Sequence, residues 1–255
     1  MDAGIEEIRI QHEIADNAFF HDFLLFLQEA GRQSFTLTKI GNLRLSDIHY
    51  FGEHFQQDIY HRGIDGERWY VRSETDVPPL RRIRLIAQSM RLTEIRGHKL
   101  LLSIRGKAYL ADASPKRQFE KLILWYFKRY DWTEWYDHRA IIAATLQWSQ
   151  SFLWRYFLFC KNSRIDFNRF LAGVRGYFGL DSLIHDPSPY FDDVRWPVEQ
   201  LLVKDLRMFG LLAVESNNSR SFIRDETIIS FQPTALGAHI FQLAIDGSAS
   251  NPTKD

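Results

Sequence analysis

One stretch of sequence decides the fold of this chain: IRLIAQSMRLTEIRGHKLLLSIRGKAYL, residues Ile83 to Leu110. In this stretch a helix-like run is followed by two strand-like segments around a polar turn, and then by another helical segment. A related stretch runs from Leu202 to Phe241, with a longer polar turn. Because self-similar segments indicate a repeated structural unit, we predict that the chain forms the same local structure twice.

The two stretches agree position by position. The aligned pairs are Leu92 with Leu211, Ser103 with Thr234, Gly106 with Gly237 and Tyr109 with Ile240. In each copy a hydroxyl residue stands three positions before a glycine, at the start of a helix. This order of elements is typical of a winged helix. We therefore predict a mainly α fold with small β-hairpin wings, in which tandem winged-helix units are joined by an aromatic-rich helical middle.

The length of 255 residues and the repeat together favour two domains. We predict an N-terminal winged-helix-like domain over 1–113, a helical segment with a C-terminal winged-helix-like domain over 114–246, and a flexible tail over 247–255. Hydrophobic residues make up 45% of the chain and charged residues 25%, as in ordinary globular proteins. The single cysteine, Cys160, excludes an intrachain disulfide and favours a reducing cytoplasm.

Two further features bear on location. Glu6 and Glu7 stand where a secretory signal would carry basic residues, which indicates that the chain is not exported. The most apolar long window, 140–160, contains several polar residues and Arg155, so we interpret it as amphipathic or buried and predict no membrane partner.

Charge is clustered along the chain although the net charge is zero. Between Arg81 and Arg129 there are thirteen Lys and Arg against three acids, a local balance of plus ten, so the rest of the chain carries minus ten. Such an asymmetry is typical of a protein with a polyanionic partner on one side.

Helix boundaries can be predicted around the first copy. A helix should follow Asp16 and stop at Gly31, a strand at 35–40 should turn at Gly41, and Ser46 should cap a further helix. The buried stripe of that helix should comprise Ile48, Phe51, Phe55 and Ile59.

Proline marks the start of the next helix in each copy. Pro78 and Pro79 should open a helix that buries Leu80, Ile83, Ile86, Ala87 and Met90 and exposes Arg81, Arg84, Gln88 and Arg91. In the second copy Trp196 and Pro197 take this role, and the buried stripe should comprise Val198, Leu201, Leu202, Leu206 and Phe209. Between the copies, 117–178 reads as three or so helices whose aromatic density predicts a thick core or an interdomain seam.

Four short motifs carry a family resemblance. They are Thr36–Leu43, Leu100–Gly106, the aromatic stretch around Trp132, and Thr234–Gly237. Together they resemble the winged-helix-type region of uncharacterised bacterial proteins related to the plasmid pRiA4b ORF-3-like and SEC-C-associated families. The chain lacks the cysteine-rich SEC-C motif, so no zinc site carries over. The resemblance implies a tandem winged-helix fold and a role in regulation, defence or mobile elements.

The first functional hypothesis is that the chain is a non-enzymatic protein that binds nucleic acid, with double-stranded DNA as partner. A winged helix places one helix in the major groove and lets its wing touch phosphates. The candidate nucleic-acid-binding residues are Arg81, Arg82, Arg84, Gln88, Arg91, Arg96, His98, Lys99, Arg105 and Lys107. The competing interpretation is a solvated helix face whose cations pair with acids elsewhere in the chain.

The second hypothesis is a protein-interaction adaptor or a subunit of a DNA-associated complex. Tandem winged helices also serve in subunits that grip kleisin segments in chromosome-organising complexes, to which this arrangement bears an architectural likeness. A large exposed aromatic patch outside the basic block would favour the adaptor, whereas a continuous basic groove would favour DNA binding. A homo-oligomer stays open under either hypothesis.

An enzyme is the third possibility. His54, Asp58 and His61 stand at helical spacing with His49 nearby, a pattern that can bind a metal, although surface histidines explain it more simply. Neither a nucleophile elbow nor a phosphate-binding glycine loop is present in the sequence. We therefore predict no catalytic residues, no metal and no cofactor.

Overall fold

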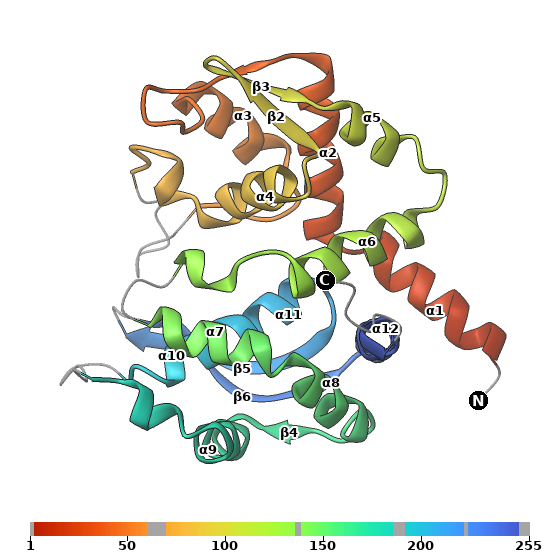
Figure 1. Ribbon diagram of the computed structural model, residues 1–255, viewed down its shortest axis with the longest axis vertical. Coiled ribbons are helices and arrows are strands. Elements are labelled where there is room, and N and C mark those ends of the chain that lie inside the picture. Colours follow the sequence, from red (N-terminus) through yellow and green to blue (C-terminus); the bar gives the residue numbers. More distant parts are fainter. Residues whose placement is uncertain (1–2, 61–69, 136–138, 186–191, 222–223, 250–255) are drawn as a thin grey trace. The chain divides into compact units, whose positions relative to one another are not determined.

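The computed structural model describes residues 3–60, 70–135, 139–185, 192–221 and 224–249 (Figure 1). The chain is mainly helical, with 64% helix and small antiparallel sheets of three strands. It divides into two compact units, which we call the first unit, Ile14–Trp125, and the second unit, Met1–Glu13 together with Tyr126–Asp255.

The helix predicted after Asp16 is present in the first unit and is capped by Asn17. Asn17 accepts a hydrogen bond from the amide of Phe20 at 2.8 Å, and the helix ends at Arg32, one residue after the predicted stop. The elements of this unit are α2 (Ala18–Arg32), β1 (Phe35–Thr36), α3 (Leu45–His54), η1 (Glu74–Asp76), α4 (Pro78–Ser89), β2 (Thr93–Arg96), β3 (Lys99–Leu102), α5 (Ile104–Leu110) and α6 (Pro115–Lys128), the last of which continues into the second unit.

The sheet of the first unit has the strand order β1-β3-β2 and is antiparallel throughout. Phe35 pairs with Leu100, which in turn faces Ile95 across the hairpin. Leu100 and Phe35 are buried, and the Phe35 ring lies 5.4 Å from that of Phe51 on α3, measured between centroids. The alternation of inward and outward side chains therefore places one face of the sheet on the core.

Two boundary predictions in this unit are wrong in detail. The predicted strand at 35–40 is a strand only over Phe35–Thr36, although the turn at Gly41 is present with φ 82°. Helix α3 begins at Leu45, so Ser46 lies inside it and does not cap it, and it ends at His54 before Phe55. Phe55 and Ile59 are nevertheless buried, because tertiary packing covers them outside the helix.

The second unit carries the aromatic middle of the sequence and the second copy of the repeat. Its elements, beyond the end of α6, are α1 (Ala3–Ala15, shared with the first unit), η2 (Trp132–Trp135), α7 (Ala140–Trp148), α8 (Gln150–Phe159), β4 (Ile165–Asp166), α9 (Phe167–Phe178), η3 (Leu180–Leu183), α10 (Arg195–Glu199), η4 (Gln200–Lys204, a π-turn), α11 (Asp205–Met208), β5 (Leu212–Ser221), β6 (Arg224–Pro233) and α12 (Ala235–Ala249).

A stacked aromatic core fills the second unit. Trp154 and Phe157 of α8, Phe127 of α6 and Phe241 of α12 are all buried. The Trp154 ring centroid lies 4.5 Å from that of Phe127 and 5.0 Å from that of Phe241. The predicted thick aromatic core is confirmed for these residues, which are drawn from three separate helices.

The sheet of the second unit has the order β4-β6-β5 and is also antiparallel. Ile165 pairs with Phe231, and Val214 faces Phe231 from the other side. The two units have their helices and strands in a matching order. The order in the first unit is α2, β1, α3, α4, β2, β3, and the order in the second unit is α8, β4, α9, the α10–η4–α11 run, β5, β6. Both units therefore share one succession of helices and strands, and in both the first strand pairs with the third.

A set of hydrogen bonds closes the hairpin of the first unit onto α5. The amide of Ser103 donates to the carbonyl of Leu92 at 2.9 Å. The Ser103 hydroxyl donates to the carbonyl of Arg91 at 2.7 Å and accepts from the amide of Gly106 at 2.9 Å. Arg91 has the left-handed φ of 58° that ends α4. A Cβ on Gly106 would lie 2.2 Å from the Leu92 carbonyl oxygen, so this position requires glycine.

The second unit makes the same contacts at the aligned positions. The amide of Thr234 donates to the carbonyl of Leu211 at 3.0 Å. Its hydroxyl donates to the carbonyl of Gly210 at 2.8 Å and accepts from the amide of Gly237 at 2.9 Å. Gly210 has φ 70°, and a Cβ on Gly237 would lie 2.0 Å from the Leu211 carbonyl oxygen. The pattern of a hydroxyl residue three positions before a glycine thus has the same cause in both units. The hydroxyl caps the helix, and the glycine leaves room for a backbone carbonyl.

The division between the units differs from the sequence boundary after residue 113. It falls within α6, after Trp125, and the N-terminal residues to Glu13 belong to the second unit. The carboxylate of Glu13 accepts a hydrogen bond from the amide of Leu236 at 2.8 Å, which ties α1 to the start of α12. Local sequence patterns do not reveal this contact, because it joins residues at opposite ends of the chain.

Within the described ranges, no helix is long and apolar enough to cross a membrane. Residues 140–160, the most apolar long window, form the separate helices α7 and α8, which meet at Ser149.

Candidate interaction surfaces

Helix α4 carries the predicted groove-reading face, and the structure corrects this prediction. All five predicted core positions from Leu80 to Met90 are buried. Arg84, which was expected to be exposed, is 6% exposed and forms an ion pair with the fully buried Glu74. Its guanidinium also donates to the side chain of Gln88 at 2.7 Å. Arg84 and Gln88 are therefore occupied within the first unit and are not presented to a base pair.

The other predicted residues of this helix vary in exposure. Arg82 is buried, with 8% exposed, and Arg81 is half-buried. Arg91 is exposed. No residue of the described helix α4 is exposed. Arg84 is buried together with its carboxylate partner Glu74, so its charge is compensated inside the unit.

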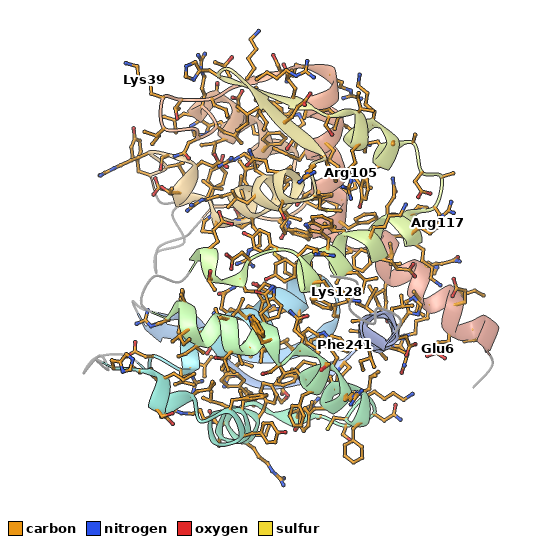
Figure 2. All side chains as sticks on the ribbon, in the orientation of Figure 1. Glu6, Lys39, Arg105, Arg117, Lys128 and Phe241 are labelled. Atoms are coloured by element: carbon orange, nitrogen blue, oxygen red, sulfur yellow. The ribbon has the colours of Figure 1, made fainter. Side chains whose placement is uncertain are left out.

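The hairpin between β2 and β3 gathers exposed cations at its turn. Arg96 and Lys99 face each other across the strands, and His98 lies in the turn between them; all three are exposed. The carbonyl of His98 accepts from the amide of Leu37 at 2.7 Å, so the chain after β1 lies beside this turn. That chain carries the exposed Lys39 (Figure 2). We call Lys39, Arg96, His98 and Lys99 the hairpin-tip cluster.

The last two predicted residues, Arg105 and Lys107, lie on α5 and are exposed. The Arg105 guanidinium lies 5.3 Å from the ring centroid of Trp125, whose indole N–H donates to the hydroxyl of Ser89 at 2.8 Å. Figure 2 shows Arg105 well apart from Lys39 in that view. The ten predicted residues therefore do not form one continuous basic face.

Asp112 neutralises part of the basic block on α6. Its carboxylate accepts from Lys121 at 2.9 Å and from Arg117 at 3.0 Å. The hydrogen bond from Lys121, followed by that from the amide of Ser114, holds the pKa of Asp112 below its ordinary value of 3.8. Two of the thirteen cations of the block are thus paired locally, as the competing interpretation expected.

Replacing Lys121 with methionine is expected to raise the pKa of Asp112 towards its ordinary value, because the largest stabilising contact of the carboxylate is lost. A depressed folded-state pKa means that this contribution to stability is present above the ordinary value and is lost as pH falls through the folded value. NMR titration of the Asp112 carboxyl carbon measures the shift. An unchanged titration midpoint in the variant would contradict the assigned contact.

Sequence reasoning missed a group of exposed aromatic side chains in the second unit. Trp148 of α7, Phe152 and Phe159 of α8 and Tyr177 of α9 are exposed by 89%, 42%, 89% and 66%. The rings of Phe152 and Tyr177 stack with centroids 4.2 Å apart. Among the described residues, four of the six exposed aromatics lie on these three helices. We call Trp148, Phe152, Phe159 and Tyr177 the aromatic face.

A signal for this face exists in the sequence. Phe152 precedes Phe159 by seven positions, which is the spacing of one side of a helix, here α8. The buried residues Leu153 and Phe157 lie on another side of the same helix. A short helix that is apolar on two sides needs a second neighbour, whereas the aromatic density of 117–178 was interpreted as a thick core or an interdomain seam.

Cations accompany the aromatic face. Arg155, Lys161 and Arg169 are exposed on the same segment. Between Trp148 and Tyr177 the sequence has five Lys and Arg against one acid, Asp166. The Asp166 side chain accepts from the amide of Arg169 at 2.8 Å, where it caps α9. This surface is therefore aromatic and cationic together.

The histidine pattern considered as a metal-binding alternative is not brought together on one helix. Helix α3 ends at His54, so Asp58 lies beyond it, and His61 falls outside the described residues. Nδ1 of His54 lies 2.7 Å from the carbonyl of Tyr50. Among the described residues, no group of three or more His, Cys, Asp or Glu is placed to hold a metal ion.

A shallow hollow of about 160 Å³ lies on the sheet of the second unit. Its polar groups satisfy one another, since Glu215 accepts from Arg164 at 2.7 Å and from the hydroxyl of Ser230 at 2.8 Å. Sites for small molecules typically enclose roughly 300–1,000 Å³. The hollow therefore offers little room for a substrate.

Comparisons with known proteins add no relative. No protein-family model matches the chain, and searches of curated proteins and of solved structures find no significant match. The family resemblance inferred from the short motifs stays a prediction.

Proposed function

We propose that the chain is a non-enzymatic adaptor, composed of two winged-helix units, that binds a partner protein through the aromatic face of the second unit. The winged-helix assignment is supported by the shared succession of helices and strands and by the β1-β3-β2 and β4-β6-β5 orders. The matching hydroxyl and glycine contacts of Ser103 with Gly106 and of Thr234 with Gly237 support a tandem repeat.

The aromatic face is the observation that carries the adaptor function. An aromatic side chain buries roughly 150–250 Å² when it is covered, so four of them on neighbouring helices account for several hundred square ångströms. Contiguous apolar patches on monomers typically mark interaction sites, and the stacked rings of Phe152 and Tyr177 form such a contiguous part of the face. Trp and Tyr are also the residues that contribute most to protein–protein binding energy. The stacked Phe152–Tyr177 pair supplies a rigid centre for such a contact.

The charge around the face selects the chemistry of the partner. Arg155, Lys161 and Arg169 are exposed on α8, on α9 and on the segment between these helices. A partner segment with apolar side chains on one side and Asp or Glu along its edge complements both features. An amphipathic acidic segment of another protein is therefore the proposed ligand.

The packing of α4 favours this function over the reading of base pairs. A groove-reading helix needs free side chains to reach base edges. In the first unit Arg84 is held by Glu74, and Gln88 accepts from Arg84. Helix α4 is the helix that a winged helix would insert into the major groove, and its side chains Arg84 and Gln88 instead make contacts within the first unit.

Selection of peptides tests the adaptor proposal. A random 16-residue library displayed on phage is panned on the full chain, and each enriched peptide is titrated by fluorescence anisotropy. We expect enriched peptides to combine aromatic or aliphatic residues with Asp or Glu. Substituting both Trp148→Ala and Phe152→Ala should weaken their binding at least tenfold, because two central anchors are removed.

A matched control uses apolar side chains elsewhere in the same unit. Ile5 and Ile8 of α1 are exposed by 63% and 61%, so the pair Ile5→Ala and Ile8→Ala removes comparable exposed apolar surface. This control should bind the peptides as the parent chain does. The proposal fails if no peptide is enriched, if enriched peptides lack acidic residues, or if both double variants bind equally.

A further inference from the structure

We infer that the hairpin-tip cluster of the first unit binds the phosphate backbone of duplex DNA, independently of base sequence. This activity is separate from the protein-binding function proposed for the second unit. It rests on where the structure places Lys39, Arg96, His98 and Lys99, and on the packing of α4 described above.

Two turns bring the cluster together from distant parts of the sequence. The turn after β1 carries Lys39, and the turn between β2 and β3 carries His98. The hydrogen bond from the Leu37 amide to the His98 carbonyl, at 2.7 Å, holds the two turns side by side. Because Arg96 and Lys99 are directly paired across the hairpin, their side chains leave the same face of the sheet.

The cations of the cluster are available to an external anion. Lys39 and Lys99 are exposed, and Arg96 is 70% exposed at its side chain. Arg96 pairs with Glu94 at 2.6 Å, but the Glu94 side chain is itself 40% exposed. Surface ion pairs of this kind contribute little to stability, typically about 0–1 kcal/mol, so a phosphate can replace the carboxylate.

The fold itself does not demand this charge. From Arg91 to Lys107 the first copy has five Lys and Arg against one acid, whereas from Gly210 to Ala238 the second copy has two Arg against three acids. Both segments nevertheless form a hairpin joined to a helix through the same capping contacts. The positive charge is therefore specific to the first unit and points to a ligand.

Phosphates suit the cluster better than an acidic protein does. The cations lie on projecting turns without an exposed aromatic anchor, and protein hot spots are enriched in such anchors. Lys and Arg on turns make the phosphate contacts that position a protein on DNA without reading sequence. Because α4 presents no exposed side chain to base edges, binding should depend on salt and not on sequence.

Fluorescence anisotropy with a labelled 30-base-pair DNA duplex tests the inference on the full chain. We expect binding at low salt. The logarithm of the association constant, plotted against the logarithm of the salt concentration, should have a slope of about −3, as for roughly three phosphate contacts. Two duplexes of unrelated sequence should bind within threefold of each other. Reversing Lys39→Glu, Arg96→Glu and Lys99→Glu together should weaken binding more than tenfold at fixed salt. Circular dichroism and thermal melting establish that the variant is folded.

The control variant carries Lys128→Glu, Arg129→Glu and Arg164→Glu, which make the same change in net charge at exposed positions of the second unit. It should retain DNA binding. Equal losses of DNA affinity in the two triple variants would assign binding to overall charge and overturn the inference. Undiminished DNA binding by the hairpin-tip variant would also overturn it. An RNA duplex and an acidic peptide serve as further probes. Tighter binding of either one than of DNA, lost in the hairpin-tip variant, would likewise overturn it.

Discussion

Replacing Gly237 with alanine is expected to lower the free energy of unfolding by about 3 kcal/mol. The new Cβ would lie 2.0 Å from the carbonyl oxygen of Leu211 and 2.9 Å from its carbonyl carbon. These are backbone atoms, and the same carbonyl accepts the amide of Thr234, so relief of the clash must move the junction between β6 and α12. Urea denaturation followed by tryptophan fluorescence measures the loss.

Glycines of α9 provide the matched control for this substitution. Gly173 and Gly176 lie inside the helix, and a Cβ on either would meet nothing within 4 Å. Alanine at these two positions should raise the free energy of unfolding by roughly 0.5–1 kcal/mol each, because glycine is a poor helix former. A Gly237→Ala variant as stable as the parent chain would show that the helix–hairpin junction is not as close as described.

Replacing Glu74 with alanine is expected to lower the free energy of unfolding by about 3–5 kcal/mol. The substitution leaves the guanidinium of Arg84 buried without its carboxylate, and desolvation of that charge is then uncompensated. It also removes the acceptor of the Leu43 amide, which donates to Glu74 at 2.8 Å. The loss is again measured by urea denaturation, together with hydrogen exchange of the amides of α4.

A double variant separates the ion pair from the packing around it. Glu74→Gln with Arg84→Met keeps an oxygen for the Leu43 amide and replaces the buried cation with an apolar side chain of similar length. It should be more stable than Glu74→Ala alone. If Glu74→Ala lowers the free energy of unfolding by less than about 1 kcal/mol, Arg84 is not held by Glu74, and its side chain is available to DNA.

The core of each unit was predictable because it follows local spacing. The apolar stripe of α4 from Leu80 to Met90, and that from Val198 to Phe209 in the second unit, are buried as their helical spacing predicts. The correspondence of Ser103 with Thr234 was also visible in the sequence, since each residue directly precedes a helix and accepts from the amide of a glycine three positions later. Such contacts join residues that are close in sequence, and the spacing of residues in a sequence predicts contacts of this kind.

The expected exposure of Arg84 and the expected burial of Trp148 are both wrong, for one physical reason. Spacing placed Arg84 on a polar side of its helix, but Glu74, ten residues earlier, turns that side inward. Aromatic density placed Trp148 with the rest of 117–178 in a thick core or an interdomain seam, but Trp148 is exposed, and the buried side of α7 is formed by Ile142, Ala143 and Leu146. Which of two plausible sides faces solvent depends on neighbours that the chain brings in from elsewhere.

The sequence by itself determined the secondary structure of the repeat, the glycine and hydroxyl junctions, and which helix sides are apolar, because each depends on backbone geometry within a few residues. Only the tertiary structure decided which charged side chains form ion pairs within the chain and which are exposed to solvent. It paired Arg84 with Glu74, left Arg96 and Lys99 exposed beside Lys39, and left the rings of Phe152 and Tyr177 exposed. Desolvation and charge pairing act between residues far apart in sequence, so the positions of the candidate surfaces could be read only from the folded chain.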